Sequence, residues 1–192
     1  MDSAYNQIVS LIWNIADDVL RDVFLRGQYR DVILPMVVLR RIDALLEPTK
    51  EAVEAKIKEI EDDGFEVEDE DITDVTGLNY YNRSKWTLSR LKSQAADDEN
   101  ILYDNFVEYL NGFSDNVKDV LQNFDYYNKA KKLADNKRLL SIIERITDPH
   151  INLTDRPAND PDGLPLPPIS NHEMGTLFEE LLRRFNEENN EE

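Results

Sequence analysis

Positively charged side chains gather in two short stretches of the sequence, where they could contact the phosphates of a nucleic acid. The first basic cluster surrounds Trp86 and consists of Arg83, Lys85, Arg90 and Lys92. The second basic cluster consists of Lys129, Lys131, Lys132, Lys137 and Arg138. Lysine and arginine contacts to phosphate position a protein on DNA without reading its sequence. The alternative for both clusters is an ordinary solvated surface, which the net charge of −18 favours.

No other combination of residues predicts a catalytic, metal or cofactor site. The two histidines, His150 and His172, each lack a second ligand at a spacing typical of metal sites. The six glycines occur singly, and the absence of cysteine excludes disulfides and thiolate ligands. We therefore expect no catalytic, cofactor-binding or metal-binding residue in this chain.

The acidic residues are distributed unevenly along the chain. Residues 51–76 hold twelve aspartates and glutamates against two lysines, a net charge of −10 within one segment. This segment is expected to be solvated, and the rest of the surface can still carry local basic patches. The sequence has no apolar stretch of about 18 residues and no secretory signal, which predicts a cytoplasmic protein that does not contact a membrane.

Apolar residues recur at helical spacing through most of the first 148 residues, which predicts an all-α fold, a compact multi-helix bundle. A chain of 192 residues suits one domain or one domain with an appendage. We predict an acidic loop or an irregular hairpin at 65–78, between helical segments. The predicted helices cover residues 5–25, 32–46, 48–64, 84–93, 99–111, 115–124, 125–134 and 136–147.

Residues 149–169 predict a Pro-rich connector, and residues 170–192 predict a final helix. Six of the eight prolines lie between Pro149 and Ser170, with a short strand expected at 151–153 or 164–166. Ser170 and Glu173 have the spacing of a capping box, which marks the start of a helix. The helix then presents one apolar stripe that requires a partner surface, formed by Met174, Leu177, Phe178, Leu181, Leu182 and Phe185.

Several blocks of the sequence, taken in order, carry a resemblance that no single block would establish. They are YRDVILPMVVLRRIDALLEPTK (29–50), YNRSKWTLSRL (81–91), NFVEYLNGFSDNVKDVLQNFD (105–125), LLSIIERITD (139–148) and MGTLFEELLRRFNEENNEE (174–192). Together they resemble the N-terminal helical domain of the modification (methyltransferase) subunit of type I restriction-modification systems. The resemblance covers nearly the whole chain.

This resemblance implies a function for a longer protein. Members of the family methylate adenine in DNA with S-adenosylmethionine, and they work with a specificity subunit, a restriction subunit and DNA in one complex. Residues 1–148 would be the N-terminal helical domain, and the last helix would lead into an absent catalytic domain. The N-terminal domain would then serve assembly and closure around DNA, with Leu177, Phe178 and Leu181 docking on this bundle or on the catalytic domain.

The motifs that methyl transfer requires are missing from this chain. The family's chemistry needs a Gly-rich cofactor loop and an Asn-Pro-Pro-aromatic motif, and neither occurs here. Asp160–Gly163 resembles a fragment of the loop without its following glycines. The resemblance therefore implies S-adenosylmethionine as a cofactor of the full-length protein only. The alternative function is an acidic helical interaction module or DNA mimic, which the net charge supports.

Overall fold

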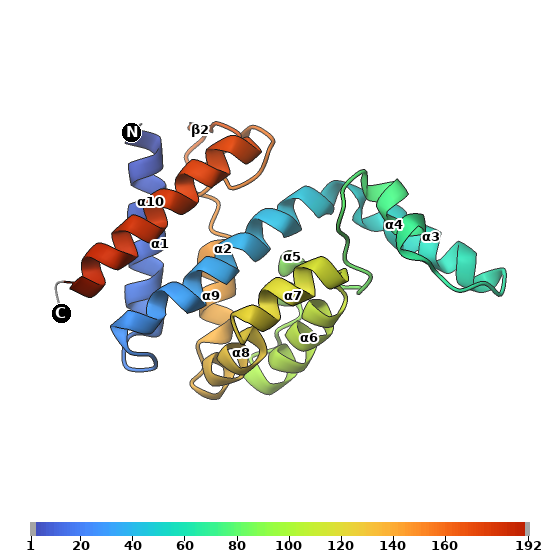
Figure 1. The fold of residues 1–192 in the computed structure, drawn as a ribbon, viewed down its shortest axis with the longest axis horizontal. Coiled ribbons are helices and arrows are strands. Elements are labelled where there is room, and N and C mark those ends of the chain that lie inside the picture. Colours follow the sequence, from blue (N-terminus) through green and yellow to red (C-terminus); the bar gives the residue numbers. More distant parts are fainter. Residues whose placement is uncertain (1–2, 191–192) are drawn as a thin grey trace.

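The computed structural model describes the backbone of residues 3–190 and the side chains of residues 5–188, and within these limits the fold is an all-α bundle, as predicted (Figure 1). Two 3₁₀ turns, Arg26–Gln28 and Glu47–Thr49, flank the second helix. The α-helices of the described residues are α1 (Ser3–Leu20), α2 (Tyr29–Leu46), α3 (Lys50–Asp62), α4 (Asp69–Thr76), α5 (Leu88–Ser93), α6 (Glu99–Asn111), α7 (Asp115–Asn123), α8 (Tyr126–Asp135), α9 (Leu139–Ile146) and α10 (Asn171–Asn190).

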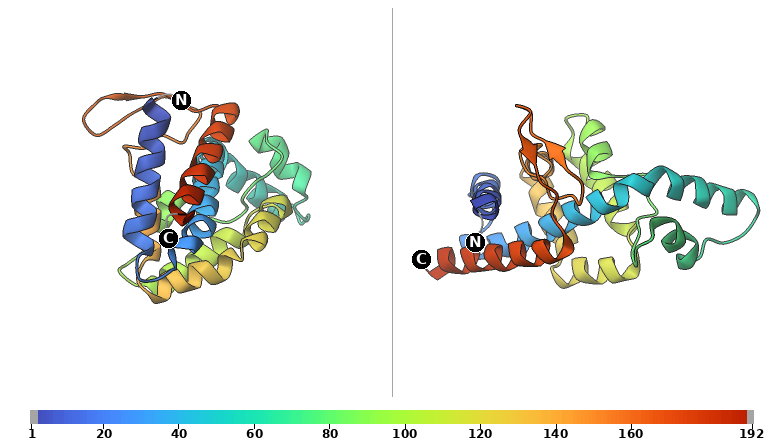
Figure 2. Two further views of the ribbon diagram at one scale, coloured as in Figure 1. Left: turned by 60° about the vertical axis from the view of Figure 1, so that its left-hand side comes forward. Right: turned by 90° about the horizontal axis from the view of Figure 1, so that it is seen from above.

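Helix α2 is the central element, because it contacts helices from both ends of the chain. It packs on α1 and α10 and also on α8 and α9. Its apolar residues, from Val32 to Leu39, are almost all buried, which explains why this stretch is the most hydrophobic of the sequence. Figures 1 and 2 show α1 and α10 near one end of α2 and the pair α3 and α4 beyond its other end.

Helices α3 and α4 form an arm that projects from the bundle (Figures 1 and 2). Helix α4 occupies residues for which we predicted a loop or irregular hairpin, so that prediction was wrong. Two local features explain the helix: the Asp71 carboxylate accepts the Glu68 N–H at 2.9 Å, and Gly77 ends the helix at φ +70°. The arm has a small core of its own, formed by Val53, Ile72 and Tyr81.

The Pro-rich connector contains a short antiparallel hairpin of β1 (Ala158–Asn159) and β2 (Pro165–Leu166). Strand β2 lies within one of the two stretches where we predicted a strand, whereas 151–153 forms none. The turn between the strands is Asp160–Gly163, with Gly163 at φ +85° and the Asp160 carboxylate accepting the Leu164 N–H at 2.8 Å. The segment that resembles a cofactor loop therefore forms a hairpin turn.

A buried arginine of α2 holds the connector and the start of α10 together. The Arg41 guanidinium donates to the carbonyl oxygens of Leu153 and Ile169 at 3.1 and 2.7 Å, and to the Asn171 side chain at 3.0 Å. Helix α10 begins with the predicted capping box: the Ser170 hydroxyl accepts the Glu173 N–H, and the Glu173 carboxylate accepts the Ser170 N–H, both at 3.1 Å. The backbone on either side of the hairpin is thus fixed to α2.

In the described part of the chain, none of the helices combines the length and the apolar character that crossing a membrane requires.

Candidate nucleic-acid interface

The first basic cluster lies on α5 and on the segment before it, beside the root of the acidic arm. Arg83 and Lys85 are exposed, and the Lys85 ammonium lies 4.9 Å from the centre of the Trp86 ring. Trp86 itself is buried, so its ring is not available for stacking on a base. Arg90 forms an ion pair with Glu54 of α3 at 2.7 Å. The arm therefore neutralises part of this cluster.

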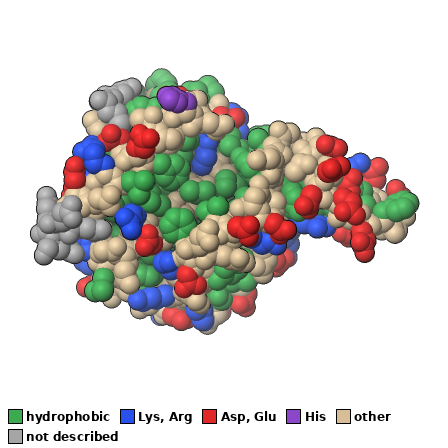
Figure 3. Space-filling view, viewed as in Figure 1, with side chains coloured by type: hydrophobic (Ala, Val, Ile, Leu, Met, Phe, Trp, Pro, Cys, Tyr) green, Lys and Arg blue, Asp and Glu red, His purple; other side chains and the backbone are tan. Residues whose placement is uncertain are grey.

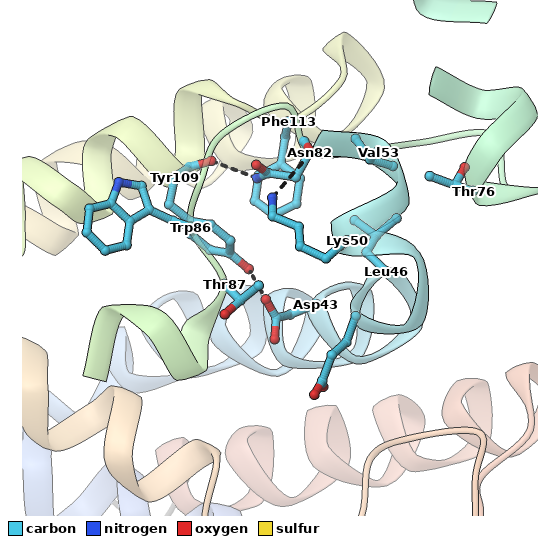
Figure 4. A pocket seen from close by; sticks show the side chains of 11 residues that line it. Asp43, Leu46, Lys50, Val53, Thr76, Asn82, Trp86, Thr87, Tyr109 and Phe113 are labelled. Atoms are coloured by element: carbon cyan, nitrogen blue, oxygen red, sulfur yellow. Dashed lines mark hydrogen bonds between the residues drawn. The ribbon is translucent and has the colours of Figure 1, made fainter. Parts of the chain in front are cut away.

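Residues 81–88, which carry part of the first cluster, are fixed to the bundle by a network of buried polar groups (Figure 4). The carboxylate of Asp43 accepts the Tyr109 hydroxyl at 3.0 Å and the Leu88 N–H at 3.1 Å. The Asn82 side chain donates to the Tyr109 carbonyl at 2.9 Å, and the Lys50 ammonium donates to the Ser84 carbonyl at 2.5 Å. Groups from α2, α3 and α6 thus converge on one segment of irregular backbone.

A glycine at the end of α6 allows this segment to approach closely. A Cβ atom at Gly112 would lie only 2.7 Å from the Asn82 side-chain oxygen and 2.8 Å from the Ser84 nitrogen. The Gly112 carbonyl also accepts the Arg83 N–H at 2.7 Å. No side chain fits at this position without a shift of the backbone.

Burial changes the protonation of two charged groups in the network. It raises the pKa of the Asp43 carboxyl, against the opposing effect of the hydrogen bonds from Leu88 and Tyr109. It lowers the pKa of the Lys50 ammonium to about 8, against the attraction of Glu54. The folded protein therefore binds the Lys50 proton less tightly than the unfolded chain does.

Lys50 is expected to give the stability a specific pH dependence. Because its pKa falls from 10.5 in the unfolded chain to about 8 in the folded protein, its contribution is fully present above pH 10.5 and is lost as the pH falls through 8. As the pH rises from about 8 to 10.5, the unfolding free energy of the wild type should therefore increase relative to that of Lys50→Met by up to about 3 kcal/mol. Denaturant unfolding at several pH values measures it, with the exposed Lys58→Met as control. A difference that does not change with pH would contradict this assignment.

The second basic cluster lies on α8 and at the start of α9. The Lys131 ammonium forms an ion pair with Asp135 at 3.0 Å and lies 5.2 Å from the Tyr103 ring. Lys132 lies 4.7 Å from the Phe24 ring, and Lys129 donates to the Phe124 carbonyl. Cation–π contacts of this kind leave the positive charge in place.

The last two members of the second cluster follow α8 directly. Lys137 is exposed at φ +59°, and Arg138 is half-buried with its Nε atom buried and unpaired. Within the described residues, Lys131 is the only cation of this cluster that forms an ion pair. The two clusters lie on different helices, since α5 carries Arg90 and Lys92 whereas α8 carries Lys129, Lys131 and Lys132, and α5 contacts α9.

The two histidines that we considered for metal binding are both on the surface. His150 is exposed, and its ring forms a hydrogen bond of 2.7 Å with the Asp148 carboxylate, which raises the pKa of the imidazole. His172 is exposed on the first turn of α10. In the part of the chain that the structure describes, no group of three His, Asp or Glu side chains is arranged to hold a metal ion.

The apolar stripe of α10 packs on this bundle. Leu177 and Leu181 are fully buried, Phe185 is buried against the Trp13 ring, and Phe178 is half-buried at the edge of the core. Helix α10 contacts both α1 and α2. The sequence left open whether these side chains dock on this bundle or on the catalytic domain. Leu177 and Leu181 are buried against the bundle, and Phe178 is more exposed than either of them.

Comparison with known proteins places this helical region in a family. A family model described as the HsdM N-terminal domain matches residues 8–146, which run from α1 to the end of α9. No curated protein and no solved structure matches the chain at a significant level. The family match covers 139 of 192 residues, the first 7 and the last 46 lying outside it. The chain therefore belongs to the HsdM N-terminal domain family, the N-terminal domain of the methyltransferase (modification) subunit of type I restriction-modification systems.

Proposed function

We propose that the full-length protein transfers a methyl group from S-adenosylmethionine to adenine in DNA, and that this chain serves its assembly and its closure around DNA. The family match over residues 8–146 carries this proposal. Since the 192 residues contain neither a Gly-rich cofactor loop nor an Asn-Pro-Pro-aromatic motif, the cofactor and the catalytic groups belong to another part of the full-length protein. The specificity and restriction subunits and DNA are its proposed partners.

The proposal is tested by mixing this chain with the purified specificity and restriction subunits and following complex formation by analytical ultracentrifugation. We expect a stable complex with at least one of the two subunits. Isothermal titration of the chain alone with S-adenosylmethionine should show no binding. Tight binding of the cofactor by this chain, or a failure to bind either subunit, would contradict the proposal that the chain serves assembly and leaves cofactor binding to another part of the protein.

The second basic cluster supports DNA backbone contact better than the first. Arg90 of the first cluster is paired with an acidic residue of the arm, and the other charges lie near the same negative field. In the second cluster, Lys129, Lys132 and Lys137 form no ion pair within the described residues. Unpaired cations release counterions from DNA when they bind phosphate, which gives binding its salt dependence.

Replacing Lys129, Lys132 and Lys137 together with alanine should weaken DNA binding by the assembled complex. The slope of log affinity against log salt is negative, and its magnitude falls by about 0.9 for every phosphate of duplex DNA that the variant no longer neutralises, so the magnitude should fall by about 3 if all three lysines bind phosphate. Fluorescence anisotropy at several salt concentrations measures this. The control replaces Arg21, Lys118 and Arg183, which already form ion pairs. Unchanged affinity and slope in the test variant would remove the second cluster from the interface.

A further inference from the structure

The loop between α1 and α2, residues 21–28, exposes an apolar side chain. Leu25 is 75 % exposed, the highest value among the large hydrophobic residues that the structure describes. The preceding residue, Phe24, is half-buried against the core. A single exposed leucine is common on protein surfaces, so the groups around Leu25 decide what it can contact.

Backbone and side-chain hydrogen bonds hold Leu25 in a fixed position. The Leu20 carbonyl accepts the N–H groups of Val23 and Phe24 at 3.1 and 3.0 Å. The Leu25 N–H donates to the Gln28 side chain at 3.0 Å, and the Gln28 N–H donates to the Leu25 carbonyl at 2.8 Å. A side chain presented in this way is preorganised, so its burial in a partner costs little conformational entropy.

The second basic cluster lies beside this loop. The Lys132 ammonium is 4.7 Å from the centre of the Phe24 ring, and Leu25 is the next residue in the chain. Residues 126–138 carry five cations and one carboxylate, a net charge of +4 in a chain of net charge −18. Figure 3 shows Lys and Arg side chains along the lower edge of the molecule, where Figure 1 shows the α1–α2 loop and α8, whereas acidic side chains cover the projecting arm.

The carboxylates near the loop do not cancel this positive charge. Asp17 forms an ion pair with Arg21 at 2.6 Å, and Asp18 forms one with Arg145 at 3.2 Å, so both pairs are neutral. Asp22 is the one carboxylate of the loop itself. The surface that carries Leu25 therefore keeps an excess of positive charge, which attracts the phosphate backbone of DNA.

We propose that Leu25 inserts into the minor groove of duplex DNA, between base steps, beside the phosphates that the second basic cluster contacts. The inference rests on the proposed function, because that cluster must lie against DNA for Leu25 to reach a groove. Proteins that bind the minor groove often insert leucine or a similar side chain between base steps, which unstacks the bases and bends the duplex. The bent DNA can then contact more of the protein surface.

The test measures DNA binding by the assembled complex at several salt concentrations, and the bend of a DNA labelled at both ends for energy transfer. Leu25→Ala should weaken binding about tenfold at every salt concentration, the factor expected when one leucine side chain is no longer buried, and it should reduce the bend. The slope of log affinity against log salt should keep its wild-type value, because no cation is removed.

Two further variants serve as controls. Leu25→Met keeps an apolar side chain of similar volume and should bind and bend DNA like the wild type. Leu164→Ala truncates another leucine that is exposed at a turn, far from the basic cluster in sequence, and should have no effect on binding. Circular dichroism confirms that each variant is folded.

The outcomes separate this inference from the proposed function. If Leu25→Ala binds and bends DNA like the wild type, insertion is overturned, and the proposed function survives. Weaker binding with an unchanged bend would also overturn insertion. If the wild-type complex does not bind DNA, the inference and the proposed DNA contact are both overturned. If Leu25→Ala prevents assembly of the subunits before DNA is added, Leu25 contacts a protein, and the inference is overturned.

Discussion

Replacing Arg41 with methionine is expected to lower the free energy of unfolding by about 3 to 5 kcal/mol, because it leaves buried acceptors without a donor. The guanidinium is the donor that the Leu153 and Ile169 carbonyls and the Asn171 side chain share, and Arg41 itself is buried. Methionine fills a similar volume, so the loss reports mainly on the hydrogen bonds. Urea unfolding followed by circular dichroism measures the change.

The Arg41 prediction has a second readout and a matched control. Hydrogen exchange should become faster in residues 150–175, because the connector and the start of α10 lose their attachment to α2. Arg30→Met, on the same helix, removes a half-exposed guanidinium that contacts Asp31 and Asn186, and it should cost less than about 1 kcal/mol. An Arg41→Met protein as stable as Arg30→Met would contradict the role of Arg41.

Replacing Leu181 with alanine should cost about 2 to 5 kcal/mol, whereas the same change at Leu182 should cost less than about 1 kcal/mol. Leu181 is fully buried between α10 and the bundle, and the adjacent residue Leu182 is 39 % exposed. Truncating the buried leucine opens a cavity in a close-packed core, and truncating its exposed neighbour does not. Both variants replace a leucine of α10 with alanine, so that they differ only in how deeply the leucine is buried. Small effects at both positions would mean that α10 does not pack on this bundle.

The helical class of the fold could be predicted from periodicity because most helices bury one face. The range predicted for 99–111 is the range of α6, and the capping box at Ser170 and Glu173 forms as predicted. Helix α4 was missed because the six acidic residues of 65–78 obscure a single buried position, Ile72. The Glu68–Asp71 capping box was the available signal.

The pairing of the buried polar groups around residues 81–88 could not be predicted from the periodicity of apolar residues. Met36, Leu39, Asp43 and Leu46 share one helical stripe, so the sequence places a carboxylate at a core position of α2. That signal could have identified Asp43 as a buried group. Its partner Tyr109 is 66 residues away, and such pairing depends on tertiary structure. The basic clusters were visible in the sequence, but the ion pair between Arg90 and Glu54 was not.

The central claim is tested most directly by measuring transfer of a tritiated methyl group from S-adenosylmethionine to DNA. The full-length protein, combined with its specificity subunit, should label adenine, and the chain of 192 residues should label nothing alone or with that subunit. A variant of the full-length protein that lacks these residues should lose labelling together with assembly on DNA. Methyl transfer by the chain itself, or full activity without it, would contradict the account.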